Sequence, residues 1–129
     1  MNRHDYFYGA QEASYPFFRT PLQIFNSDDL PETSLEARFL YCYLLNRVGL
    51  SAKNGWTDEQ GRVYIYCTIA EIMKTVHCAN HKAIKLLDEL EHGAGLIERK
   101  RQGLCKPNRI YVKNFLPPKE QEGEQKEEE

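Results

Sequence analysis

The sequence predicts an α+β fold in which helices dominate and a β-hairpin comes last. Three observations support this: apolar residues recur with helical spacing in three segments, two of these open on a Thr-x-x-Glu pattern, and the basic end of the domain reads as two strands around a glycine–proline turn. The last two helical segments are short and long, with a tight turn between them, and the basic hairpin follows. This order is typical of a winged helix-turn-helix.

The central helix is predicted to start after Pro31. Thr33 and Glu36 fit a capping box, whose two side chains satisfy free backbone amides at a helix start. The residues that follow are apolar on nearly every side, which indicates a helix buried on most sides, and we expect it to end near Gly49. The aromatic segment before it fits a dimer interface and a cover over the core equally well.

A strand and a short helix are predicted next. Residues 62–67 (RVYIYC) are β-branched and aromatic, and turn residues precede them, so we expect a strand. Thr68 and Glu71 fit a second capping box. Apolar residues then recur at i, i+3, i+4 and i+7, which predicts one helix of about two turns ending at Val76.

The second helix of the pair is predicted to follow a break at residues 77–79. Its apolar face consists of Ala83, Leu86, Leu87 and Leu90. His81, Lys85 and His92 point the opposite way. Gly93 and Gly95 end this helix, and residues 96–101 and 109–115 read as two strands joined by a turn at residues 102–108.

The net charge of −2 conceals an uneven distribution. Residues 117–129 hold six glutamates and two lysines, whereas residues 74–114 hold nine basic and four acidic residues, a local net of +5. We therefore expect a flexible N-terminal segment (1–15), one domain (16–116) and a disordered acidic tail or linker (117–129). The chain lacks a membrane-spanning apolar run and a signal-peptide pattern, so we expect a cytoplasmic protein.

The basic block predicts an interface for double-stranded DNA. The major groove admits one helix, whose exposed N-terminal side chains reach base edges, while cations on a hairpin neutralise phosphates. The candidate residues on the helix are Asn80, His81, Lys82 and Lys85. Those on the hairpin are Arg99, Lys100, Arg101, Lys106, Arg109 and Lys113.

The chain resembles the N-terminal domain of the plasmid replication initiator protein A family. The matching blocks are 49–56 (GLSAKNGW), 58–68 (DEQGRVYIYCT), 82–90 (KAIKLLDEL), 95–104 (GLIERKRQGL) and 106–115 (KPNRIYVKNF), with a weaker match at 16–26. The resemblance implies a winged helix that binds repeated sites at a plasmid origin, often as a homodimer, and a further C-terminal domain after a linker. It also leaves room for contacts with proteins that load the replisome.

Two residues depart from the family pattern. Ala79 stands where serine is usual before the second helix of the pair, and alanine cannot cap, so we expect Asn80 to cap rather than to contact a base. Cys105 stands where glycine is usual at the turn of the hairpin, so the backbone conformation of this turn, and with it the direction of the Lys106 side chain, is expected to differ from that in the family.

Other interpretations of the residues are weaker. His77, Cys78 and His81 lack the second ligand pair of a zinc site, and no phosphate loop or hydrolase motif is present, so we expect no metal, no cofactor and no enzyme activity. Trp56, Tyr64 and Tyr66 fit core or sheet positions better than stacking on melted bases. A transcription regulator and a winged domain that binds only protein remain alternatives to the initiator.

Overall fold

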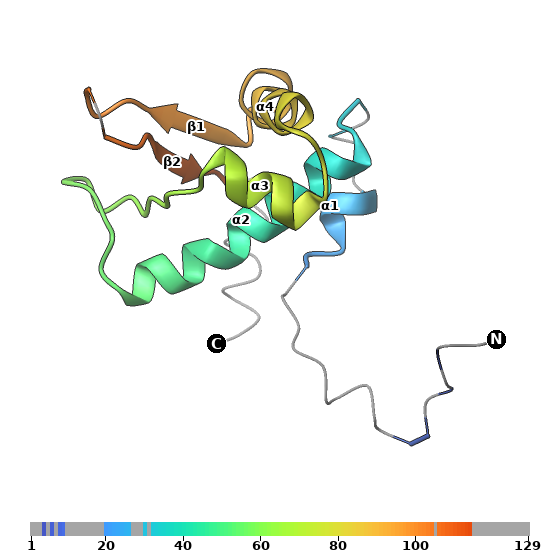
Figure 1. Cartoon of the computed structure of the whole chain (residues 1–129). Helices are drawn as coiled ribbons and strands as arrows, with labels where there is room; N and C mark the ends of the chain where they lie inside the picture. The colour runs from blue at the N-terminus through green and yellow to red at the C-terminus, as the bar shows by residue number, and fades with distance from the viewer. Residues whose placement is uncertain are drawn as a thin grey trace.

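The computed structural model describes residues 4, 6, 8–9, 20–26, 30, 32–104 and 106–114. The predicted acidic tail (117–129) and most of the predicted N-terminal segment (1–15) lie outside these residues. Figure 1 shows helices packed together with a two-stranded hairpin beside them. The elements are α1 (Gln23–Asn26), α2 (Leu35–Lys53), α3 (Ile69–Val76), α4 (Asn80–Asp88), the π-helical turn η2 (Glu89–Gly93), β1 (Ile97–Lys100) and β2 (Arg109–Val112). None of the described helices is long and apolar enough to cross a bilayer.

Helix α2 is the central helix, as its apolar composition predicts. It contacts α1, α3, α4, η2 and β2, and five of its apolar residues are buried: Ala37, Leu40, Tyr41, Cys42 and Leu44. The predicted end near Gly49 is wrong, because the helix continues to Lys53. A glycine within a helix costs only about 1 kcal/mol, and Ser51 beyond it is buried and accepts a hydrogen bond from the Trp56 backbone at 3.0 Å.

The start of α2 also differs from the prediction by one residue. Ser34, not Thr33, is the N-cap, and its Oγ accepts from the Ala37 amide at 3.2 Å. The capping box assigns to Glu36 the carboxylate that accepts from the backbone amide of the N-cap residue. In the structure Glu89 provides this carboxylate, which accepts from the Ser34 amide at 2.5 Å and from the Ser34 hydroxyl at 3.0 Å. A long-range contact thus replaces the local capping box and ties the start of α2 to the end of α4.

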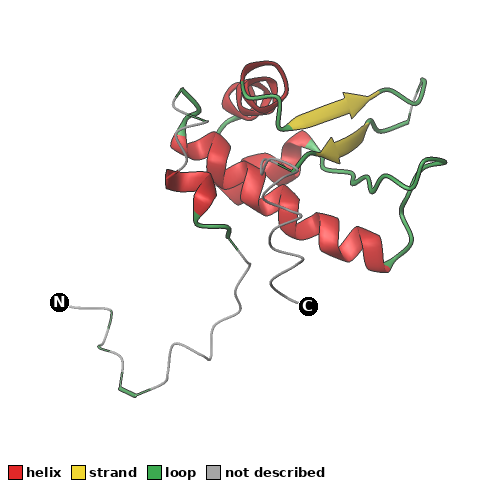
Figure 2. Ribbon diagram, turned by 180° about the vertical axis from the view of Figure 1, so that it is seen from behind, coloured by secondary structure: helices red, strands yellow, loops and turns green. Residues whose placement is uncertain are grey.

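The predicted strand at residues 62–67 is wrong as a continuous strand. Val63 forms an isolated bridge with Thr57, and Ile65 forms one with Ile110. The Ile65 amide donates to the Ile110 carbonyl, and the Ile110 amide donates to the Ile65 carbonyl, each at 2.9 Å. Seen from behind, the loop before α3 passes beside the two strands (Figure 2). Buried Ile65 supplies the one pairing position that anchors this loop to the hairpin.

The helix pair α3–α4 forms as predicted. Thr68 caps α3 by accepting from the Glu71 amide at 3.1 Å. His77 ends α3 in the left-handed region at φ 60, and the Cys78 amide donates to the Met73 carbonyl at 3.0 Å, which closes the turn. Together with the hairpin that follows, this pair confirms the predicted winged helix-turn-helix, and α4 occupies the position of the recognition helix.

The hairpin is antiparallel; β1 is one residue shorter than predicted at each end, and β2 starts at Arg109 as predicted but ends earlier, at Val112. Its register pairs Ile97 with Val112 and Lys100 with Arg109. Buried Ile97 and Ile110 belong to the same core as α2, and the Tyr41 hydroxyl donates to the Lys113 carbonyl at 2.6 Å. We call β1, β2 and the turn between them the wing. Its base is therefore fixed to the central helix.

Candidate nucleic-acid interface

Helix α4 begins without a side-chain cap. Its N-cap is Ala79, which is extended at φ −81 and ψ 168 and makes no side-chain capping bond. Asn80 is the first helical residue and is exposed, so the prediction that Asn80 caps the helix is wrong. The side chain of Asn80 is thereby presented to solvent at the start of the recognition helix.

One face of α4 points to solvent along its whole length. His81, Ile84, Lys85 and Asp88 are all exposed and recur at i, i+3, i+4 and i+7. The opposite side is buried through Ala83, Leu86 and Leu87. Lys82 flanks this face, and its Nζ lies 3.1 Å from the Glu36 carboxylate in a pair that is about half exposed.

Three cations of the wing are exposed and form no ion pair with any described residue. Lys100 ends β1, Arg101 follows it, and Lys106 lies in the turn. We call Lys85, Lys100, Arg101 and Lys106 the cationic rim. Lys113 differs from them, because its Nζ is 3.8 Å from the Glu98 carboxylate. Cys105 lies outside the described residues.

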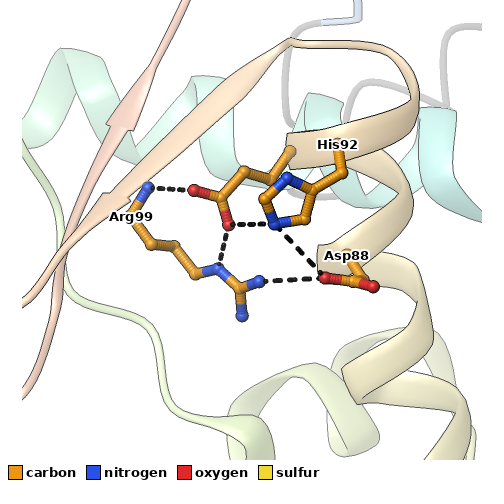
Figure 3. A network of polar contacts seen from close by, with 4 residues as sticks. Asp88, His92 and Arg99 are labelled. Carbon is orange, nitrogen blue, oxygen red and sulfur yellow. Dashed lines mark hydrogen bonds and ion pairs between the residues drawn. The ribbon is translucent and has the colours of Figure 1, made fainter.

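Arg99 has a different environment from the rim, although it is next to Lys100 in the sequence. Figure 3 shows its guanidinium turned from β1 toward the end of the recognition helix. Its Nε donates to the Glu91 carboxylate at 2.6 Å, and its Nη2 lies 3.4 Å from Asp88. The Arg99 amide also donates to Glu91, at 3.0 Å. We call Asp88, Glu91, His92 and Arg99 the α4–β1 seam.

The seam fixes the charge state of Glu91. Partial burial by itself would raise the pKa of this carboxyl, but the Arg99 amide and guanidinium hold the pKa below its ordinary value. His92 lies 3.6 Å from both Asp88 and Glu91, so it adds a second cation beside Arg99 when it is protonated. The Arg99 guanidinium therefore offsets part of the negative charge that Asp88 and Glu91 place beside the recognition helix.

Arg109 faces an aromatic cluster on the other side of the hairpin. Its guanidinium lies 4.3 Å from the centroid of the Tyr64 ring, and its Nε donates to Gln102 at 3.1 Å. The Tyr64 ring stacks on Trp56 at 6.3 Å and meets Tyr66 edge-on at 5.6 Å. These rings pack against one another beside the hairpin, although the residues that carry them lie in the loop before α3 and not in the predicted strand.

The ten predicted site residues thus fall into two sets. His81, the four rim residues and Asn80 are exposed on α4 and the wing, whereas Lys82, Arg99, Arg109 and Lys113 have partners within the protein. Sequence reasoning missed Glu91 as the partner of Arg99, since contacts between side chains of different elements leave no local pattern. It also missed Ile84, which the helical periodicity could have placed on the exposed face.

The architecture and the site define a winged helix-turn-helix domain with a cationic recognition face. Residues 16–125 match the family model described as the N-terminus of replication initiator protein A (RepA). The chain belongs to this family. A curated relative named "41 kDa protein", from Lactobacillus helveticus, is 30% identical over 81 residues. This match covers 58% of the chain but only 23% of the relative, so the chain corresponds to a minor part of that protein.

Solved structures show the same fold. One is described as the N-terminal domain of a DNA binding protein; it shares 30% identity at a TM-score of 0.68, with 98% of this chain and 96% of that chain covered. A second is described as the structure of a Rep–DNA complex; it shares 30% identity at a TM-score of 0.67, with 96% of this chain and 95% of that chain covered. A third, described as an MDR initiator, shares 27% identity at a TM-score of 0.65, with 97% of this chain and 99% of that chain covered.

Proposed function

We propose that this chain binds double-stranded DNA at repeated sites of a plasmid or mobile-element replication origin and thereby takes part in initiating replication. The observation that carries the proposal is the exposed face of α4 together with the cationic rim, which α4 and the wing share, in a chain of the replication initiator protein A family. The similarity to the chain of a solved Rep–DNA complex supports it. The role proposed is binding rather than catalysis, and its place is the cytoplasm, where plasmid DNA lies.

The rim gives the proposal a physical form. Four exposed cations without partners among the described residues, together with Lys82, can neutralise about five phosphates per domain. The exposed Lys82–Glu36 pair costs little to break, because such pairs contribute about 0–1 kcal/mol. We expect His81 and Asn80, which are exposed in the first turn of α4, to contact base edges when the helix enters the major groove.

A homodimer and contacts with proteins that load the replisome belong to the same proposal. Repeated sites allow more than one copy to bind one duplex, and a two-fold dimer would match two half-sites that are inverted with respect to each other. Sedimentation of the chain with and without a duplex carrying one or two repeats measures the stoichiometry. A single copy on every duplex would remove the dimer from the proposal.

The test is an equilibrium titration against duplexes carrying the direct repeats that flank the gene, with a random duplex as competitor. The slope of log Kobs against log salt should be about −4.5 per domain, since each of about five neutralised phosphates contributes about −0.9. The double variant Lys100→Ala/Arg101→Ala should reduce this slope by about two units while retaining sequence preference. Lys53→Ala, an exposed lysine at the end of α2, is the matched control and should bind like the wild type. Equal affinity for repeats and random DNA would contradict the proposal.

A further inference from the structure

Ile84 is an apolar residue in the middle of the exposed face of α4. Its side chain is 48% exposed, while the apolar residues on either side of it, Ala83 and Leu86, are buried. His81 and Lys85 are its neighbours on the same face at i−3 and i+1. The core therefore does not account for Ile84.

Helix propensity does not account for it either. Isoleucine is β-branched and less favourable in a helix than lysine, glutamate or alanine, any of which would be tolerated at an exposed position. The surrounding charges make a broad apolar docking surface a poor explanation, since such surfaces are contiguous and Ile84 is bordered by Lys85 and Asp88. A single apolar side chain between polar ones instead fits a ligand that carries a single apolar group between polar ones.

The major groove of DNA is such a ligand. Base edges there present hydrogen-bond donors and acceptors, and the 5-methyl group of thymine is the apolar group among them. Ile84 is the fifth of the nine residues of α4, one turn after Asn80 and next to the N-terminal residues that a recognition helix lays against the bases. Neighbours three or four residues apart are about 5–6 Å apart at Cβ, so His81 and Ile84 can reach adjacent base pairs.

The charge beside Ile84 is compatible with this contact. Asp88 is the acidic residue on the same face, and its carboxylate lies 3.4 Å from the Arg99 guanidinium and 3.6 Å from His92. Figure 3 shows Arg99 and His92 both directed at Asp88. The seam thus reduces the repulsion that Asp88 would exert on the phosphates flanking a bound base.

We propose that the side chain of Ile84 reads the 5-methyl group of a thymine in the major groove and so determines part of the sequence preference. This rests on the proposed DNA-binding function and adds a residue and a base to it. Ile84 acts by apolar contact, whereas Lys85 and the wing contact phosphates, so its loss should change which bases are preferred rather than the dependence on salt.

The test combines a protein change with a DNA change. Wild type and Ile84→Ala are titrated with the repeat duplex and with duplexes in which each thymine in turn is replaced by deoxyuridine, which removes only the methyl group. At one or two thymines the wild type should lose about three- to tenfold in affinity. Ile84→Ala should be weaker on the unmodified repeat by a similar factor and should not respond to deoxyuridine at those thymines.

Two controls separate the outcomes. Lys100→Ala should bind more weakly to every duplex and keep the full response to deoxyuridine, and thermal melting should show Ile84→Ala folded, because alanine favours the helix. Wild type that prefers the repeat but ignores deoxyuridine at every thymine would overturn the Ile84 inference alone. Retention of the full deoxyuridine response by Ile84→Ala would do the same. Wild type that does not prefer the repeat to random duplex would overturn both proposals.

Discussion

The α4–β1 seam and the cationic rim both contain basic side chains of one short run, residues 99–101, yet the environments of these side chains differ. Arg99 in the seam is about one quarter exposed and contacts two carboxylates. Lys100 and Arg101 follow directly, are exposed and have no ion-pair partner among the described residues. A basic run in a sequence therefore contains residues with two roles: those that orient the wing against the recognition helix and those available to a ligand.

The largest effect expected is on the seam. Arg99→Ala leaves the carboxylates of Glu91 and Asp88 without their guanidinium partner, and Glu91 is only 16% exposed. We expect the free energy of unfolding to fall by about 2–3 kcal/mol, measured by urea denaturation at neutral pH. DNA affinity should fall as well, because two uncompensated negative charges then lie beside the recognition helix.

Arg101→Ala is the matched control for this prediction, since it removes the same side chain two residues away in the rim. Its free energy of unfolding should stay within about 0.5 kcal/mol of the wild type. Equal stabilities for the two alanine variants would remove the distinction between the seam and the rim.

The second effect concerns the contact between Glu89 and the start of α2. Glu89→Ala removes the acceptor of the Ser34 amide and hydroxyl, and we expect a loss of about 1–2 kcal/mol. Glu36→Ala is the control, because its carboxylate pairs with Lys82 in an exposed position and should contribute under about 1 kcal/mol. If Glu36→Ala were the more destabilising change, the cap would be the local box that the sequence predicts.

The order of elements could be predicted because it depends on local patterns. The helical spacing of apolar residues predicts α3 and α4, and the Thr-x-x-Glu pattern predicts the Thr68 cap. Glycine and proline in the turn indicate where the hairpin lies. Two of the errors have a common cause in contacts between distant segments. Ser34 rather than Thr33 caps α2, and this cap is completed by Glu89, which is 55 residues away along the chain and so leaves no local pattern. Residues 62–67 have strand composition but pair with the hairpin only at Ile65.

The candidate site was predictable to a similar degree. Periodicity alone identifies His81 and Lys85 as exposed, and the same count assigns Ile84 to their face. It cannot show that Arg99 is engaged, because its partner Glu91 lies within the π-helical turn, in which the Ala94 amide donates to the Glu89 carbonyl at 2.9 Å, and α-helical periodicity does not describe such a turn. This wider turn shifts the following residues around the helix axis relative to an α-helix.

The smallest effect is a dependence of stability on pH. Arg99 holds the pKa of Glu91 below its ordinary value in the folded protein, so this carboxylate contributes stability at pH values above its unfolded pKa, about 4.3, and loses it as the pH falls through the folded-state pKa. Glu91→Gln cannot ionise. It should be less stable than the wild type by about 1 kcal/mol from pH 7 to 5, and the difference should shrink below about pH 4. Urea midpoints across this range measure it, with Glu98→Gln, an exposed glutamate on β1, as control. A constant difference between wild type and Glu91→Gln down to pH 3 would mean that packing of the side chain, and not its charge, connects α4 to the wing.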